Sequence, residues 1–513
     1  LQWLALAIDL QSFGMGNGFC SHALKAHDDS EVQYVDVSKL VLPPGPRHFP
    51  PSVCSSDPTD GECIFLLERA LNVEYDNLLG ALNCQGASRA RGRPHVQAWA
   101  QDEHGDVVGK VAKWPAKSIS ANPSWYSARP LGFPLARHQA STLCIELWED
   151  RTLLGSLAVP LKHVPVHSSA TRELERRAGT SSSKASCSVA FQILDSRAVC
   201  DERVVFFVRH GESVWNKAQD SMQFHEMAGK TDHPLSTKGR EQAEALSKRL
   251  GKAAKQADAA LQHLIQPEVV FVSPLTRAIQ TAVIAMGPTM TKPNGRGELV
   301  LMANAREKQN FGGLDTRSTK LGVEVLQNAL DELCALYDGE EKGAVDSFAR
   351  LRFDTRDVQD TWWFDGMAES SADLQARMQE FMSQLLYSPY RSIVVVGHSH
   401  FFRAVFKSYL SDGFCVENRE LARAISSKKL MNCGVARVKL DPKRGLSGGP
   451  ITGVDLVLDT KLDSDGMGLM ACCAADAHRT ASGTSRDEEF LSDPGEAYEP
   501  VPGGGPPPPG RPL

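Results

Sequence analysis

The chain has 513 residues, of which 42% are hydrophobic and 23% charged, so it can form two to four soluble globular domains. Its formal net charge of −6 argues against a dedicated nucleic-acid-binding protein, which would carry a basic excess. The twelve cysteines contain no Cys-x-x-Cys pair, which argues against a zinc site and fits a reducing compartment. No apolar run approaches the roughly 18–20 residues that a membrane-spanning helix needs, and the stretch Trp3–Ile8 is too short for a signal peptide. We therefore expect a cytoplasmic protein, with peripheral membrane association as an alternative.

Both ends of the chain have compositions that are typical of disorder. Residues 1–60 contain clustered prolines followed by Ser, Asp and Gly, so we expect a poorly ordered leader with room for one short packed element. Residues 463–513 are acidic, rich in Ser and Gly, and end in a Gly/Pro run. We expect this segment to be a disordered tail.

Residues 61–197 show short apolar runs separated by turn signals, a pattern that predicts an all-β sandwich. Residues 168–188 are rich in Ser, Ala and Arg, so we expect a loop there. The expected strands are 95–100, 141–148, 156–161 and 187–194.

Three segments of this sandwich carry a family resemblance: Asn122-Pro123-Ser124-Trp125, Leu143–Asp150 and Val159-Pro160-Leu161. The first is similar to the Asn-Pro-x-Trp step of the C-two family, and the others are similar to its late strands. That family binds calcium and phospholipid through several loop aspartates. Here Asp150 stands nearly alone, and calcium needs six to eight oxygen ligands. We therefore expect a metal-free sandwich that docks on a membrane surface or on a protein.

From residue 200 to 462, apolar runs alternate with amphipathic helical patterns, which predicts a three-layer, doubly wound α/β domain. One helical stripe, Ala243, Leu246 and Leu250, precedes Gly251, where we expect that helix to end. Two further stripes follow in 326–337 and 374–385. The expected strands are 204–208, 269–272, 299–302 and 393–396.

Side chains that suit phosphate chemistry follow all four strands. Because the carboxyl ends of parallel strands open on one edge of a sheet, we expect these side chains to converge. Ser273 can also cap the helix that carries Arg277. His398 and His400 could suggest a metal pair, but no carboxylate or thiolate cluster accompanies them, so we expect no metal and no cofactor. The converging residues are Arg209, His210, Arg277, Glu307 and His398.

The same segments resemble the histidine phosphatase superfamily, which includes the phosphoglycerate mutases, over about residues 204–440. The resemblance implies a phosphohistidine enzyme with this fold, and it implies that Asn216 and Ser213 also bind substrate. The matching segments are Arg209–Ser213 with Trp215-Asn216, Asp232–Ser236 with Gly239, Ser273–Thr281, Glu369-Ser370 with Arg377, and Gly397–Ser399 with Phe402-Arg403.

The residues themselves indicate a reaction. A neutral His210 can attack phosphorus. Arg209, Arg277 and a protonated His398 can neutralise the phosphoryl oxygens. Glu307 can protonate the leaving oxygen and then activate water.

The sequence favours a phosphatase over a phosphomutase, because the mutases carry an Arg-rich insert after their acid residue and Glu307 is followed by no paired arginines. Candidates for substrate contact are Arg317, Arg350 and Arg352, and the Trp362-Trp363-Phe364 run could form either an aromatic wall or a core segment. A third alternative is a non-enzymatic adaptor that binds a phosphorylated ligand. The expected substrate is a phosphorylated small molecule or a phosphoprotein, and the oligomeric state stays open.

Overall fold

The structure is a computed structural model, and it describes a β-sandwich, an α/β domain and one short N-terminal segment. The expected tail and most of the expected leader lie outside the described residues. The described residues are 35–42, 63–71, 73, 94–115, 131–133, 141–149, 152–164, 169–175, 187–195, 202–221, 231–292, 295, 297–309, 314–338, 342–359, 361–364, 366–388 and 390–463.

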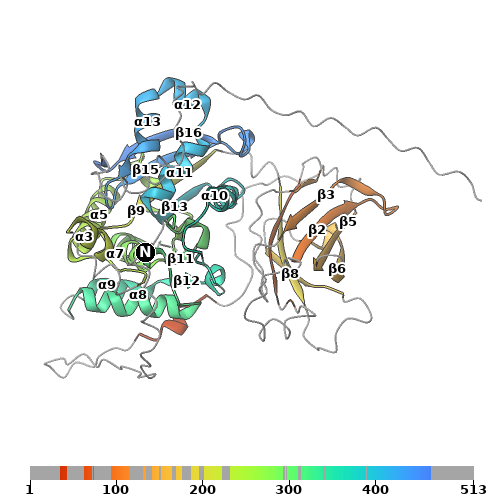
Figure 1. Ribbon diagram of the computed structural model, residues 1–513, viewed down its shortest axis with the longest axis horizontal. Coiled ribbons are helices and arrows are strands. Elements are labelled where there is room, and N and C mark those ends of the chain that lie inside the picture. The colour runs from red at the N-terminus through yellow and green to blue at the C-terminus, as the bar shows by residue number, and fades with distance from the viewer. Residues whose placement is uncertain are drawn as a thin grey trace, which may run out of the picture. The chain divides into compact units, whose positions relative to one another are not determined.

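A seven-stranded sheet in the order β12-β11-β10-β13-β9-β15-β16 forms the centre of the α/β domain (Figure 1). Its first five members are parallel, and β15 is antiparallel to both of its neighbours. The four strands expected from sequence are confirmed as β9, β10, β11 and β13. The bounds are β9 Arg203–Arg209, β10 Val269–Val272, β11 Glu298–Leu301, β12 Arg352–Asp354, β13 Ser392–Gly397, β15 Val435–Leu440 and β16 Ile451–Val457.

Helices cover both faces of this sheet, as the sequence predicts. Side chains alternate along the strands: Phe206 and Val208 belong to one hydrophobic core, and Val205 and Phe207 belong to the other. The first core includes α5 (Thr237–Lys255), α6 (Gln262–Ile265), α7 (Thr276–Met290), α8 (Val323–Leu336) and α9 (Lys342–Arg350). The second includes α10 (Ser371–Leu386), α11 (Ser399–Tyr409), α12 (Asp412–Glu417) and α13 (Arg419–Ser427).

The expected end of α5 at Gly251 is wrong. The helix continues to Lys255, because Ala253 also lies on its buried face and extends the apolar stripe by one turn. A Cβ at Gly251 would meet nothing within 4 Å, so the glycine is not required there by a close approach.

A short N-terminal segment packs on the α/β domain, although it precedes the sandwich in the chain. The 3-10 helix η2 (Val37–Leu40) buries Val37 and Leu40 in the first core, beside α8 and α9 (the red turn in Figure 1). The next residues add to the sheet edge: Val41 pairs in parallel with Phe353, and the Leu42 N–H donates to the Phe353 carbonyl at 2.8 Å. The segment therefore covers the otherwise unpaired edge of β12, which would be a site for aggregation if exposed.

Residues 63–195 form two four-stranded antiparallel sheets, β4-β1-β8-β7 and β3-β2-β5-β6, whose inner side chains share one core. β7 shows that the loop expected over 168–188 is wrong in its first part, since Ala170 packs into that core. The Asn122–Trp125 segment lies outside the described residues. The strands are β1 Cys63–Leu71, β2 Pro94–Gln101, β3 Val107–Pro115, β4 Leu131–Phe133, β5 Thr142–Glu149, β6 Thr152–Pro160, β7 Ser169–Glu173 and β8 Ser188–Asp195.

Among the helices that the structure describes, none combines the length and apolar character needed to cross a bilayer.

Replacing Leu40 by Asp tests whether η2 belongs to the α/β domain. Leu40 is 8% exposed, so placing a carboxylate there should lower the free energy of unfolding by about 2–4 kcal/mol. The measurement is urea unfolding followed by helical circular dichroism. Lys39→Ala, at a side chain that is 80% exposed, should change this value by less than about 0.5 kcal/mol. Equal stability of the two variants would contradict the packing.

Candidate active site

The two histidines that follow β9 and β13 lie side by side, because these strands are neighbours in the sheet. Their ring centroids are 4.9 Å apart, and both side chains are buried, with His210 3% and His398 0% exposed. The His210 N–H donates to the Gly397 carbonyl at 3.0 Å, which ties the two strand ends together. The expected convergence is therefore present for this pair.

The backbone sets the tautomer of His210. Its Nδ1 lies 2.6 Å from the Gly211 carbonyl, and a carbonyl oxygen can only accept, so Nδ1 carries the proton. The Nε2 lone pair is then available for attack. Burial, followed by the charges of Arg277 and Arg209, lowers the pKa of His210 well below its ordinary value, which keeps this imidazole neutral.

His398 shares the environment of His210. Its Nε2 lies 2.7 Å from the Ser273 hydroxyl, whereas its Nδ1 is buried and has no hydrogen-bond partner among the described residues. Burial and then Arg277 lower the pKa of His398 well below its ordinary value. Before a ligand binds, this shift favours the neutral ring, whereas the protonated His398 that the sequence led us to expect belongs to the phosphate-bound site. A phosphate dianion would favour protonation by supplying the missing counter-charge.

Two guanidinium groups supply the positive charge near these rings. Arg209, at the end of β9, donates from Nη1 to the Leu430 carbonyl at 2.5 Å. Arg277, in the first turn of α7, donates from Nη1 to the Asp315 carbonyl at 2.7 Å, with Nη2 3.4 Å from the Asp315 carboxylate. Both lower the pKa of His210 and of His398, so both charges act at the paired rings.

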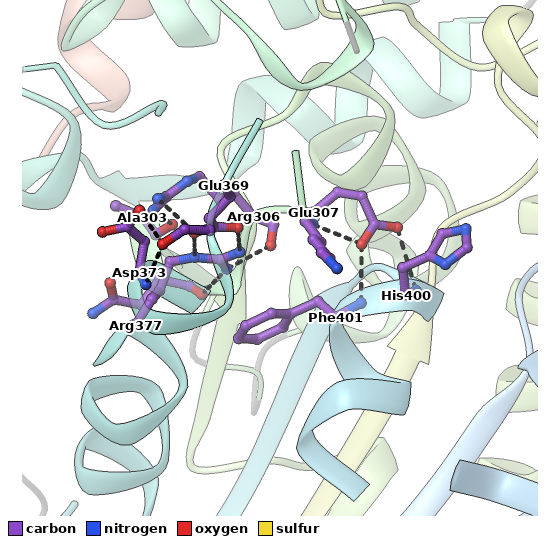
Figure 2. Close-up of polar contacts among 11 residues, drawn as sticks. Ala303, Arg306, Glu307, Glu369, Asp373, Arg377, His400 and Phe401 are labelled. Atoms are coloured by element: carbon purple, nitrogen blue, oxygen red, sulfur yellow. Dashed lines mark hydrogen bonds and ion pairs between the residues drawn. The ribbon is translucent and has the colours of Figure 1, made fainter. Parts of the chain in front are cut away.

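Glu307 is held against the N-terminus of α11, directly after His398. Its Oε1 accepts from the Phe401 N–H at 2.9 Å and from the Lys308 N–H at 2.8 Å. Its Oε2 accepts from the His400 N–H at 3.3 Å (Figure 2). The positive end of the helix dipole stabilises an anion at this place. The carboxylate is 7% exposed and sits at the same strand end as His398.

A buried ion-pair network lies behind Glu307. Arg377 of α10 binds Glu369 through two contacts of 2.7 and 2.6 Å, and Arg306 adds a third at 3.3 Å (Figure 2). Arg377 also donates to the carbonyls of Asn304 and Arg306 at 2.9 Å, so it fixes the backbone that leads into Glu307. Its guanidinium lies 4.4 Å from the Phe401 ring centroid. Sequence reasoning noted Glu369 and Arg377 but gave them no role.

The turn after β9 is held by close backbone packing. A Cβ at Gly211 would lie 2.5 Å from the Gly239 carbonyl oxygen, so no larger side chain fits there. The Gly211 N–H donates to the Thr281 hydroxyl at 3.0 Å, and the Asn432 side chain donates to the His210 carbonyl at 3.1 Å. The sequence did not point to Asn432, because the expected site was built from residues that follow parallel strands. Asn432 instead precedes β15, which is antiparallel to β9.

Ser213 and Asn216 form a capping box at the start of α3 (Val214–Asp220). The Ser213 hydroxyl accepts from the Asn216 N–H at 3.1 Å, and Asn216 Oδ1 accepts from the Ser213 N–H at 3.3 Å. Their contacts with one another explain these residue types without a ligand. Asn216 retains its amide N–H groups as possible donors, so its role in substrate binding stays a prediction.

Ser273 does not cap α7 as expected, because the helix begins two residues later than the cap requires and Leu275 occupies the N-cap position. The Asp232 side chain, which comes from a segment well before α7 in the sequence, caps this helix instead. Its carboxylate accepts from the Thr276 N–H at 2.9 Å and from the Thr276 hydroxyl at 2.8 Å. Burial raises the pKa of Asp232 to about 6, opposed by Arg277. The cap fixes the helical turn that carries Arg277.

The other candidates divide between the two ends of the sheet. In the sheet, Arg352 of β12 lies beside Glu298, the first residue of β11, so it is at the opposite end of the strands from the histidines. Neither Arg352 nor the preceding Arg350 is therefore in position to contact a ligand at the histidines. Trp362 is buried in the first core and donates to the Lys320 carbonyl at 3.0 Å, which supports the core interpretation of the aromatic run. Arg317 follows Asp315 closely and stays a candidate. The described residues contain no cluster of His, Cys, Asp or Glu that could hold a metal ion.

Residues 205–299 match the sequence profile of the histidine phosphatase superfamily (branch 1), so this part of the chain carries a domain of that superfamily. Over 79 residues the chain is 39% identical to 2,3-bisphosphoglycerate-dependent phosphoglycerate mutases of Bifidobacterium longum strain DJO10A and of Bifidobacterium longum subsp. infantis. That match covers 15% of this chain and 26% of each relative, so the chain spans about a quarter of the length of these curated relatives.

Three similar solved structures have low TM-scores against this chain. A mycobacterial glucosyl-3-phosphoglycerate phosphatase is 18% identical, with 50% of this chain and 98% of that chain covered and a TM-score of 0.27. A phosphoglycerate mutase from Bacillus anthracis str. Sterne is 17% identical, with 51% and 95% covered and a TM-score of 0.28. A C-two domain (domain A) of plant Extended Synaptotagmin 1 is 19% identical, with 27% and 96% covered and a TM-score of 0.20. At these scores we draw no conclusion from them.

Replacing Arg377 by Leu tests the network behind Glu307. The change leaves the buried Glu369 carboxylate with Arg306 alone, so we expect the α/β domain to lose about 3–5 kcal/mol of stability in urea unfolding. The double variant Arg377→Leu/Glu369→Leu should recover most of this loss. Arg423→Leu, at an exposed position of α13, serves as the matched control and should change stability by less than about 0.5 kcal/mol. If the double variant were no more stable than the single one, the loss would not come from the unpaired carboxylate.

Proposed function

We propose that the protein is a phosphomonoester hydrolase that works through a phosphohistidine on His210. The observation that carries the proposal is the His210 ring. The Gly211 carbonyl fixes its Nδ1 proton, and burial together with two arginine charges lowers its pKa and keeps the ring neutral. A neutral imidazole with an available Nε2 is a phosphoryl acceptor. The superfamily match at 205–299 supports an enzyme of the phosphatase or mutase type.

The reaction has two displacement steps. In the first, Nε2 of His210 forms a bond to phosphorus while the bond from phosphorus to the ester oxygen breaks, and Glu307 as a carboxylic acid gives its proton to the leaving alcohol. In the second, the Glu307 carboxylate takes a proton from water, whose oxygen bonds to phosphorus as the bond to Nε2 breaks. Arg209, Arg277 and a His398 protonated on ligand binding neutralise the transferring oxygens.

We favour hydrolysis over phosphoryl transfer between two positions of one substrate. The curated relatives are named as 2,3-bisphosphoglycerate-dependent phosphoglycerate mutases, and a mutase must also hold the carboxylate of its substrate. In this chain Glu307 is followed by Lys308 and then by uncharged Gln309, and Arg350 and Arg352 lie at the other end of the sheet. The second candidate, a phosphomutase, would need paired arginines after the acid residue, which these positions do not supply.

Trapping the intermediate tests the proposed function. We expect a ³²P-labelled aryl phosphate to label the wild-type protein with an acid-labile, base-stable phosphoryl group, and His210→Ala to abolish labelling and to lower kcat by at least about 10⁴-fold. His263→Ala, which changes a histidine on α6, should leave both unchanged. Hydrolysis by His210→Ala at the wild-type rate would refute the mechanism. Conversion of 3-phosphoglycerate to 2-phosphoglycerate faster than phosphate release would favour the mutase.

For the sandwich we propose a metal-independent docking role on a membrane surface or a protein. The Asp102 carboxylate accepts from the backbone N–H groups of His104 and Asp106, both at 2.9 Å, so it forms the turn between β2 and β3. An aspartate used in this way contributes little to a calcium site, which needs several converging carboxylates.

Flotation of the full chain with liposomes that contain phosphatidylserine tests this proposal. We expect equal recovery with 1 mM calcium and with excess chelator. Binding that requires calcium would overturn the metal-independent role. Absence of binding in both conditions would remove the membrane as the docking surface and leave the protein partner.

A further inference from the structure

Each of the two arginines beside the paired histidines has an aspartate next to its guanidinium. For Arg277 the partner is Asp315, with its carboxylate 3.4 Å from Nη2 and its carbonyl 2.7 Å from Nη1. For Arg209 it is Asp463, with its carboxylate 3.9 Å from Nη1. The two aspartates come from the 3-10 helix η5 (Leu314–Thr316) and from β17 (Leu462–Asp463), which are far apart in the sequence.

The pair formed by Arg277 and Asp315 is the tighter of the two. The Arg277 side chain is 2% exposed and the Asp315 side chain 16%, so solvent screens their attraction only weakly. The carbonyl contact comes from the same residue, so it keeps the Asp315 backbone beside Arg277. Asp463 is 54% exposed and lies farther from its arginine, so it is the weaker partner.

These aspartates reduce the positive charge that remains for a ligand. Both histidine rings are neutral before binding, because burial and the arginines lower the pKa of each. Burial raises the pKa of the Asp315 carboxyl, Arg277 opposes this shift, and the nearby Glu307 adds to it. The two guanidinium charges are thus balanced by the carboxylates of Asp315 and Asp463. A phosphate dianion adds two negative charges to this balance, and protonation of His398 on binding offsets one of them. Any further anion on the substrate then adds to the repulsion from Asp315.

We propose that Asp315, assisted by Asp463, makes the site selective for phosphomonoesters whose alcohol part is uncharged, and disfavours substrates that carry a second anion such as a carboxylate or another phosphate. Asp315 acts through Arg277 and is a positioning and specificity-determining residue. The inference rests on the proposed phosphatase function and narrows its substrate class. A carboxylate within about 6 Å of a second anion in a poorly solvated site disfavours that anion by tenfold or more.

Two synthetic substrates of the same shape test the charge preference: 4-carbamoylphenyl phosphate, which has a neutral carboxamide, and 4-carboxyphenyl phosphate, which has a carboxylate. The readout is the ratio of their kcat/KM values for phosphate release. We expect the wild-type enzyme to prefer the carboxamide by about tenfold or more, and Asp315→Asn to reduce this ratio to about threefold or less. Asp315→Glu, which restores the charge, should keep a ratio near the wild-type value.

Asp331→Asn is the matched control, because it removes the same charge from an exposed position of α8. It should leave the ratio unchanged. If Asp315→Asn slows both substrates equally, or if the wild-type enzyme prefers the carboxylate, the proposal is overturned. A purely structural role for Asp315 would produce the first of these results, since misplacing Arg277 weakens binding of the phosphate that both substrates share.

Asp463→Asn gives an independent arm if Asp315→Asn does not fold. Its side chain is half exposed, and its removal should shift the ratio in the same direction by about twofold. With Asp315→Asn unfolded, an unchanged ratio in Asp463→Asn would overturn the proposal. Failure of the proposed function is distinguishable: it would appear as no phosphohistidine on His210, whereas failure of this inference leaves the phosphohistidine intact and the ratio unaltered.

Discussion

Two arginine charges buried at the carboxyl edge of the sheet are the constraint on which the rest of the site depends. Arg277 is 2% and Arg209 7% exposed, and a charge removed from water is costly unless other groups compensate for it. The protein compensates with the Asp315 contact and with backbone carbonyls. Burial and then these same charges lower the pKa of the neighbouring His210, so the groups that would bind phosphate also help to prepare the nucleophile.

The two sides of the site are supported in different ways. On the Arg277 side, the buried carboxylate of Asp232 holds the first turn of α7 through Thr276, so that turn depends on a segment more than forty residues earlier. On the Glu307 side, Arg377 fixes the carbonyls before the carboxylate, and α11 supplies its N–H donors. Both supports are buried and held by several hydrogen bonds, which favours a rigid site. A rigid arrangement of charges is what stabilises a transition state without reorganisation.

How much the sequence predicts depends on the range of the interactions. The strands that end at His210, Arg277 and His398 are unbroken apolar runs, and parallel pairing alone then determines that their ends meet. The edge strand β12 is three residues long, and the antiparallel β15 carries alternating charges, so neither has the pattern of a buried parallel strand. Asp315 and Asn432 act through contacts with residues that are distant in the sequence. The hydrophobic periodicity of the sequence, which predicts strands and helices, gives no information on such contacts.

The segment before the sandwich has a consequence for how the two domains fold. Val41 is fixed on β12, and the chain returns to the α/β sheet at Arg203, about 160 residues later. Closing a loop of that length opposes the docking of η2, and the entropy cost rises with the logarithm of the length. A folded sandwich removes most of its residues from the loop, which lowers the closing cost by on the order of 1–2 kcal/mol. Folding of the sandwich therefore favours docking of η2 and protection of the sheet edge, even though η2 shares no side-chain core with the sandwich.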